Sequence, residues 1–149
     1  MRFHLIDRIT DYTSWKVAKG FKNITKSDEL ISNNKDKRIK YSNNLLCESV
    51  FQTLAWLIVK SSQQTKRPVI LSIEELSYFR EVLLVDRQII TEVSIDEIQE
   101  EVIICSGKAY IEDSMILSFS NCLVSLLDTT DLEDCRATEA MLDVLYREE

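Results

Sequence analysis

The segment Glu48-Ser-Val-Phe-Gln52 places a carboxylate and an amide four residues apart within a mostly apolar stretch. Residues with this spacing lie on one face of a helix, one turn from each other. A carboxylate can give or take a proton in catalysis, and an amide can hydrogen-bond to it. The spacing therefore predicts a hydrogen-bonded Glu48–Gln52 pair. A purely structural interpretation puts Glu48 in the first helical turn, where the helix dipole favours an anion.

The helix that carries this pair is predicted over Leu45–Lys60. Its apolar residues occupy every side of the helical wheel, which is typical of a buried helix. It is too short, and too interrupted by Glu48 and Gln52, to be read as a membrane span. The preceding residues Ser42–Asn44 can cap its N-terminus.

Other groups with reactive chemistry are scattered. Histidine occurs once, as His4, and is expected to pack on a strand; the cysteines form no CxxC pair. Neither a zinc site nor a cysteine–histidine catalytic pair can be assembled within one chain, so we expect no metal and no cofactor. We interpret the four cysteines as free buried thiols: Cys47, Cys105, Cys122 and Cys135.

The composition is that of a globular chain, with 149 residues, 45% hydrophobic and 29% charged. The net charge of −7 is unevenly distributed: residues 1–44 hold ten Lys/Arg and five Asp/Glu (+5), and residues 45–149 hold eight and twenty (−12). An acidic chain is a poor non-specific nucleic-acid binder, although a local basic patch can steer an acidic partner or be only a solvated face. The basic residues ahead of the helix are Lys35, Lys37, Arg38 and Lys40. The N-terminus lacks the features of a secretory signal, which predicts a cytoplasmic protein with no membrane segment.

Strand patterns flank the helix. Residues 87–96 alternate, with Ile89, Thr91, Val93 and Ile95 on one face. Residues 2–9 and 14–24 are expected strands before the helix, and 69–84, 100–113 and 114–128 are β-rich runs after it, the last two joined by a hairpin around Asp113. A terminal helix is predicted over about 132–147, with the apolar stripe Ala140, Met141, Val144 and Leu145. The plan is α+β, a curled antiparallel meander around one long central helix.

Four segments match, in order, the motifs of one family. Phe3–Ile9 is similar to F-x-L-I/V-D-R-I/V, Phe21–Thr25 to V-K-N-V-S/T, Glu48–Gln52 to E-A-x-x-Q, and Ser77–Asp86 to A-x-F-x-x-P-V-x-P-G-D. The chain thereby resembles, over nearly its whole length, the hot-dog-fold β-hydroxyacyl-acyl-carrier-protein dehydratases of fatty-acid and polyketide synthesis. The resemblance implies a single hot-dog domain over residues 1–149, with Glu48 as the catalytic acid and Gln52 and Phe79 at substrate-binding positions.

The sequence departs from this family at the loop before the helix. There the family has a segment of the type G-H-F-P-G-x-P-x-x-P-G, and an ungapped comparison lays it on residues 33–43. Asn34 stands at the histidine, Lys37 at a glycine, Asp36 and Ile39 at two prolines, and Ser42 and Asn43 at the closing Pro-Gly. An asparagine amide does not titrate near neutral pH and so cannot replace the histidine as general base.

Three hypotheses follow from the resemblance. The chain is an impaired dehydratase of 3-hydroxyacyl thioesters on acyl carrier protein, with Glu48 acting alone; or a non-catalytic subunit that completes the site of a histidine-bearing paralogue; or a hot-dog thioesterase in which Glu48 activates water. Lys35, Lys37, Arg38 and Lys40 would recruit the acidic carrier protein. We expect a homodimer or a heterodimer with that paralogue, because the family pairs two sheets.

Overall fold

The structure is a computed structural model that describes residues 4–25, 31–33, 39–83, 86–129 and 134–147, with the side chains of all of these except 31–33 and 39. The elements in chain order are β1 (Arg8–Thr13), β2 (Val17–Asn23), β3 (Ile31–Asn33), β4 (Ile39–Tyr41), α1 (Asn43–Ser61), β5 (Lys66–Tyr78), β6 (Val82–Leu83), β7 (Gln88–Gln99), β8 (Val102–Ile111), β9 (Ser114–Asp128) and α2 (Cys135–Leu145).

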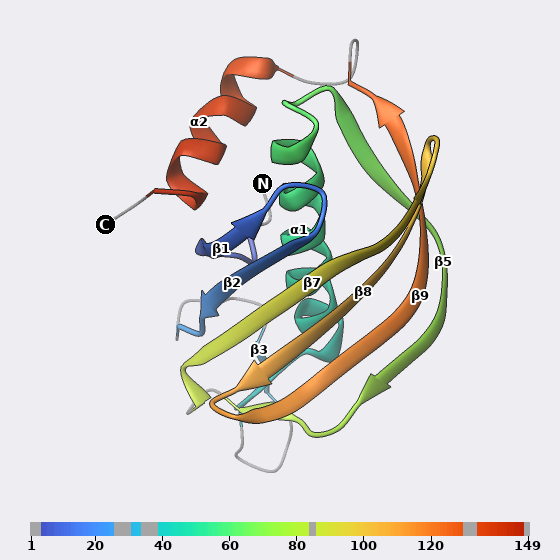
Figure 1. Cartoon of the computed structure of the whole chain (residues 1–149). Coiled ribbons are helices and arrows are strands. Elements are labelled where there is room, and N and C mark those ends of the chain that lie inside the picture. The colour runs from blue at the N-terminus through green and yellow to red at the C-terminus, as the bar shows by residue number, and fades with distance from the viewer. Residues whose placement is uncertain (1–3, 26–30, 34–38, 84–85, 130–133, 148–149) are drawn as a thin grey trace.

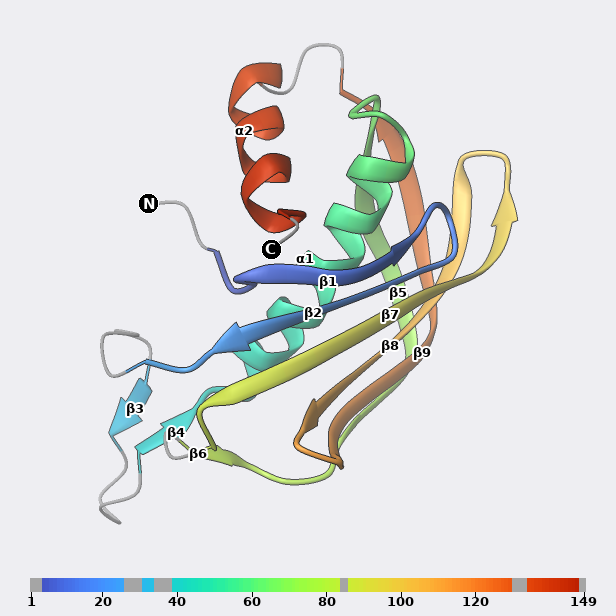
Figure 2. The same cartoon turned by 60° about the vertical axis from the view of Figure 1, so that its left-hand side comes forward.

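A six-stranded antiparallel sheet in the order β1-β2-β7-β8-β9-β5 curls around α1 (Figures 1 and 2). A small second sheet, β3-β4-β6, lies near the start of the helix. The helix packs against β2, β5, β7 and β8, and the core lies between it and the concave face of the sheet. The predicted α+β plan of a curled sheet around one long helix is confirmed.

The strand order corrects the expectation that all the strands after the helix form one continuous meander. β7, β8 and β9 form the predicted meander, and the β8–β9 hairpin turns at Glu112 and Asp113. β5, however, pairs with β9 at the far edge of the sheet. It cannot lie beside β7, because β2 and β8 already occupy the two edges of that strand.

The first strand begins later than predicted, at Arg8 rather than at residue 2. The backbone N–H of Leu5 donates to Oε1 of Gln52 on α1, at 2.8 Å, and not to a neighbouring strand. His4 precedes β1 and is exposed, so the expectation that it packs on a strand was wrong.

The helix α1 starts at Asn43 because Ser42 caps it, accepting a hydrogen bond from the Asn44 N–H at 3.2 Å. Glu48 is consequently the sixth helical residue, and the first turn contains no acidic residue. The interpretation that the helix dipole holds Glu48 in the first turn was therefore wrong. Among described residues, no helix is long and apolar enough to cross a membrane.

Two of the polar interruptions in α1 are satisfied inside the core. Thr53 donates to the Ser49 carbonyl at 3.0 Å, and its oxygen lies 2.7 Å from that of Thr91 on β7. Ser49 bonds back to the Leu45 carbonyl at 2.9 Å. These bonds let a helix that is buried on most sides carry hydroxyls without orphaned polar atoms.

The terminal helix α2 begins at the cap Asp134 and lies beside β1 and the C-terminal end of α1 (Figure 1). Its buried residues are Thr138 and Leu145, with Met141 half-buried, whereas Ala140 and Val144 are exposed. The predicted stripe was thus rotated, because Thr138, Met141 and Leu145 follow the helical i, i+3, i+7 spacing on the packed face. Of the four thiols, Cys135 is exposed, so only the other three are buried as expected.

Candidate functional site

The candidate site lies on the N-terminal half of α1, where Glu48 is exposed and Gln52 is partly buried. The Gln52 amide oxygen accepts the Leu5 N–H at 2.8 Å, and its amide nitrogen donates to Oε1 of Glu48 at 3.2 Å. The predicted Glu48–Gln52 hydrogen bond is confirmed. Because the Leu5 bond fixes which side of the amide carries the oxygen, the NH₂ group is directed at the carboxylate.

Leu5 belongs to this site although its side chain does no chemistry. Its backbone connects the segment before β1 to the middle of α1, 47 residues away in the sequence. The bond gives the exposed Glu48 carboxylate one fixed donor. A held carboxylate of this kind can serve as an acid or a base at a position set by the helix.

Cys47 and Tyr78 form a second pair beside Glu48 that the sequence did not reveal. Burial raises the pKa of the Cys47 thiol, and a hydrogen bond with Tyr78 offsets only part of this. Burial, with the neighbouring Cys47, raises the pKa of Tyr78 to about 12. Both groups therefore stay protonated at neutral pH, which suits them to donate hydrogen bonds and not to act as bases.

Phe79 follows Tyr78 just past the end of β5. Its side chain is 56% exposed, and its backbone N–H donates to the Ile116 carbonyl at 2.9 Å. The Cys47–Tyr78 hydrogen bond brings this end of β5 to the first half of α1. The assignment of Phe79 to a substrate-binding role stays a prediction.

Of the basic residues predicted to bind carrier protein, the structure describes only Lys40. Lys40 lies on β4, and its Nζ forms a salt bridge with Oε1 of Glu81 at 2.7 Å. Lys40 therefore presents a charge that is already partly neutralised. Asn34, Lys35, Lys37 and Arg38 lie outside the described residues.

The edge strand β5 exposes apolar side chains along its length. It pairs with β9 along one edge, and it is the last strand of the sheet. Val69, Ile70, Leu71 and Leu76 are 40–55% exposed. An edge with this much exposed apolar surface is a site where another chain can pair.

No family model matches the sequence, and no curated protein matches it. Solved structures with the same architecture do match, at low identity. The conserved protein PA5202 from Pseudomonas aeruginosa is 12% identical, with 80% of this chain and 87% of that chain covered and a TM-score of 0.63. A glutamate-to-alanine variant of the hypothetical protein SAV0944 from Staphylococcus aureus is 8% identical, with 80% and 92% covered and a TM-score of 0.63.

A third similar structure is the thioesterase HI1161 from Haemophilus influenzae, which is 8% identical, with 85% of this chain and 81% of that chain covered and a TM-score of 0.61. At these identities the likeness concerns the fold alone. Together with the observed topology it defines a hot-dog-like α+β protein.

Proposed function

We propose that this chain is a hot-dog protein that binds acyl thioesters and hydrolyses them with Glu48 as general base. The observation that carries the proposal is the Leu5–Gln52–Glu48 chain of hydrogen bonds, which holds one carboxylate on the exposed face of the central helix. The neighbouring Cys47 and Tyr78 keep their protons, so Glu48 is the group of this cluster that can accept one.

Hydrolysis needs only one such group. Water attacks the thioester carbonyl while Glu48 takes its proton, the carbon–sulfur bond then breaks, and the departing thiolate receives the proton from Glu48. The products are a carboxylic acid and a free thiol. A fold shared with a protein described as a thioesterase supports this assignment.

A second candidate is the dehydratase-like role, catalytically impaired or completed by a histidine-bearing partner. The Leu5–Gln52 bond favours it, because it joins the two segments that resemble the dehydratase motifs, Phe3–Ile9 and Glu48–Gln52. In this role the substrate is a 3-hydroxyacyl thioester on acyl carrier protein, recruited by the basic residues 35–40.

One assay separates the candidates. Purified protein is incubated with saturated acyl thioesters and, separately, with 3-hydroxyacyl thioesters, and both thiol release and enoyl formation are measured. Cys135 is exposed and would react with a thiol reagent, so the measurements use the Cys135→Ser variant. We expect thiol release from the saturated substrate that falls by about 10²–10⁴-fold in Glu48→Gln. The matched control is Glu139→Gln, an exposed carboxylate on α2.

The other results have distinct meanings. Thiol release that survives Glu48→Gln contradicts the proposed mechanism. Enoyl formation without thiol release supports the dehydratase. Binding of thioester without turnover supports the non-catalytic subunit, and turnover that appears only after a histidine-bearing hot-dog protein is added supports completion in trans.

We further propose that β5 pairs with β5 of a second copy, so that the functional unit is a dimer. No described strand pairs with the outer edge of β5, and this edge and the apolar residues along it support the arrangement. Leu71→Lys should shift the protein toward the monomer in sedimentation experiments, whereas Ile98→Lys, at a residue that is also 50% exposed but lies near the β7–β8 turn, should not. A wild-type monomer at all concentrations rules the dimer out.

A further inference from the structure

The segment that supplies the Leu5 N–H to Gln52 is itself bound to the end of β2 by Asp7. Oδ2 of Asp7 accepts the backbone N–H of Asn23 at 2.6 Å. The backbone N–H of Asp7 donates to the Phe21 carbonyl at 2.9 Å. Hydrogen bonds to an ionised carboxylate are stronger than those between neutral groups. Asp7 is therefore fixed to β2 by its backbone and by its side chain.

Lys22, beside Asn23 on β2, brings a positive charge to the same carboxylate. Its side chain is only 8% exposed, and its Nζ lies 3.8 Å from Oδ1 of Asp7. A lysine is rarely buried to this extent unless an opposite charge faces it. One oxygen of Asp7 thus meets a backbone N–H, and the other faces a buried ammonium.

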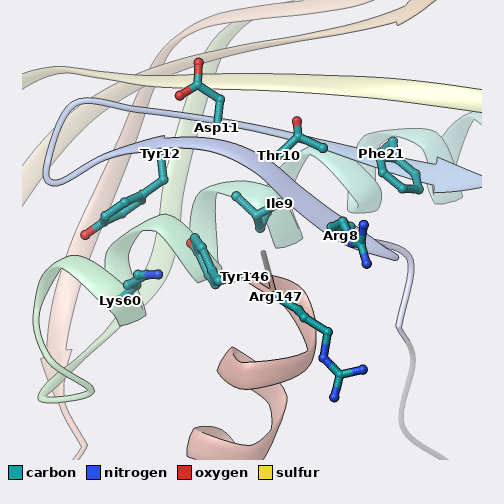
Figure 3. A pocket seen from close by; sticks show the side chains of 9 residues that line it. All are labelled: Arg8, Ile9, Thr10, Asp11, Tyr12, Phe21, Lys60, Tyr146 and Arg147. Atoms are coloured by element: carbon teal, nitrogen blue, oxygen red, sulfur yellow. The ribbon is translucent and has the colours of Figure 1, made fainter. Parts of the chain in front are cut away.

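The strand that follows Asp7 contains a bulge. The pairing of β1 with β2 skips one residue between Ile9 and Asp11, so Thr10 is the extra residue. Figure 3, which shows a cavity of about 600 Å³ beside β1, has the side chains of Ile9 and Tyr12 on one side of the strand and those of Thr10 and Asp11 on the other. A regular strand alternates its side chains, and here two consecutive ones share a side.

This bulge sets the position of the residues before it. Without the extra residue they would lie one residue further along β2, a displacement of about 3.3 Å. The burial of Ile9 selects the face that it presents, and the bonds of Asp7 select the position along β2. A Cβ at Gly20 would lie 2.7 Å from the Arg8 carbonyl oxygen, so β2 has a glycine where the bulged strand approaches most closely.

Leu5 is two residues from this anchor, at most about 7 Å of chain. Leu5 and Ile6 are both buried, at 5% and 4% exposure, so this segment does not alternate as a strand does. Contacts between apolar side chains are non-directional, whereas the bonds of Asp7 fix a position and a direction. The place from which the Leu5 N–H reaches the Gln52 oxygen is therefore set in large part by Asp7.

We propose that Asp7 is a positioning residue of the Glu48 site, a role that rests on the function proposed above. Asp7 does not act on the substrate. It holds the Leu5 N–H on Gln52, and Gln52 then presents its NH₂ group to the Glu48 carboxylate. A carboxylate without this donor can turn away from the reacting atoms, and a displacement of about 1 Å can slow a reaction by about 10²-fold.

Amide hydrogen exchange, measured by NMR on the full chain, tests this geometry without any substrate. The Asp7 side chain is 37% exposed, so Asp7→Ala leaves no cavity. We expect the Leu5 N–H to be protected in the wild type and to exchange at least about tenfold faster in Asp7→Ala, while amides in the middle of α1 keep their protection. Asp7→Asn keeps an oxygen that can accept the Asn23 N–H, so it should restore most of the protection. The matched control is Asp11→Ala, which removes an exposed carboxylate of β1 and should leave the exchange of Leu5 unchanged.

Thioester turnover tests whether this position matters for the chemistry. Asp7→Ala should lower kcat by about tenfold with little change in KM, as expected when an interaction is lost in the transition state and not in substrate binding. Gln52→Ala should show a similar loss. Adding Asp7→Ala to Gln52→Ala should cost no more, because Asp7 acts through Gln52. A merely structural role would give losses that multiply in the double variant.

The proposal is overturned if the Leu5 N–H exchanges as slowly in Asp7→Ala as in the wild type, whether or not the protein hydrolyses thioesters. It is also overturned if that N–H is unprotected in the wild type, or if the losses of kcat multiply. Absence of thioester hydrolysis by the wild type contradicts the proposed function instead, and the exchange of the Leu5 N–H still decides whether Asp7 holds its bond to Gln52.

Discussion

The buried hydroxyl pair Thr53–Thr91 predicts an unequal response to two matched substitutions. Thr53 donates its single hydroxyl hydrogen to the Ser49 carbonyl at 3.0 Å, so the 2.7 Å contact with Thr91 needs the hydrogen of Thr91. Both residues are 0% exposed. Thr53→Val therefore leaves the Thr91 hydroxyl without its acceptor inside the core, whereas in Thr91→Val the Thr53 hydrogen keeps its bond to the helix.

The magnitudes follow from this difference. Loss of one hydrogen bond costs about 0.5–1.5 kcal/mol, and a buried polar group left unsatisfied costs about 1–3 kcal/mol. We expect the loss of unfolding free energy to be about 0.5–1.5 kcal/mol for Thr91→Val and about 1–3 kcal/mol for Thr53→Val. In a domain of this size, each 1 kcal/mol lowers the melting temperature by roughly 2–4 °C. The double variant should lose less than the sum of the single losses, because no hydroxyl remains to be orphaned.

Urea unfolding measures these free energies, followed by the fluorescence of the two tryptophans. The slope against urea should be the same in all variants, since valine matches threonine in shape. A Thr91→Val loss equal to or larger than that of Thr53→Val refutes the donor assignment. Strictly additive losses in the double variant refute the coupling of the two hydroxyls.

Three more predictions follow from the core. A Cβ at Gly107 would lie 2.8 Å from Cγ1 of Val50, so Gly107→Ala should lose about 1–3 kcal/mol in the same urea experiment, and an unchanged midpoint would contradict this packing. A thiol reagent should modify Cys135 in the native protein and the three buried thiols only after denaturation; rapid labelling of all four would contradict their burial. Burial raises the pKa of Cys122 from 9.0 to about 11, so the folded state keeps a proton that the unfolded chain releases. The contribution of this proton to the free energy of unfolding is complete below pH 9 and is lost as the pH rises toward 11. A urea midpoint that is as high at pH 10.5 as at pH 8 would argue against it.

The parts of the fold that the sequence predicted are those governed by local pattern. The alternation over residues 87–96 identified β7, and the all-round apolar character of Leu45–Lys60 identified the central helix, whose observed bounds are Asn43–Ser61. The position of β5 could not be predicted in this way. Which edge a strand joins depends on the two edges that other strands leave open, and this is a property of the whole sheet.

The error in α2 has a similar origin. Ala140, Met141, Val144 and Leu145 are all apolar and plausible as a stripe, but the packed face is set by where the helix meets β1 and α1. Thr138 joins that face because the Arg67 guanidinium donates to its hydroxyl at 3.1 Å. A polar residue with a distant partner is invisible to a pattern based on hydrophobicity.

The same distinction between local and long-range contacts applies to the candidate site. The pair Glu48–Gln52 was predictable, because four residues on a helix always bring two side chains together. Leu5 and Tyr78 were not, because each reaches α1 through the fold, over 47 residues in the case of Leu5 and Gln52.

The Leu5–Gln52 bond also determines the role of Gln52. If Gln52 bonded only to Glu48, its amide could rotate by half a turn and place its oxygen against Glu48, where it would repel the carboxylate. The Leu5 N–H prevents this rotation, because it needs the amide oxygen on its own side. The segment before β1 therefore determines which group faces Glu48. For this reason the stretch at residues 4–7, which forms no strand, belongs to the proposed chemistry as much as the helix does.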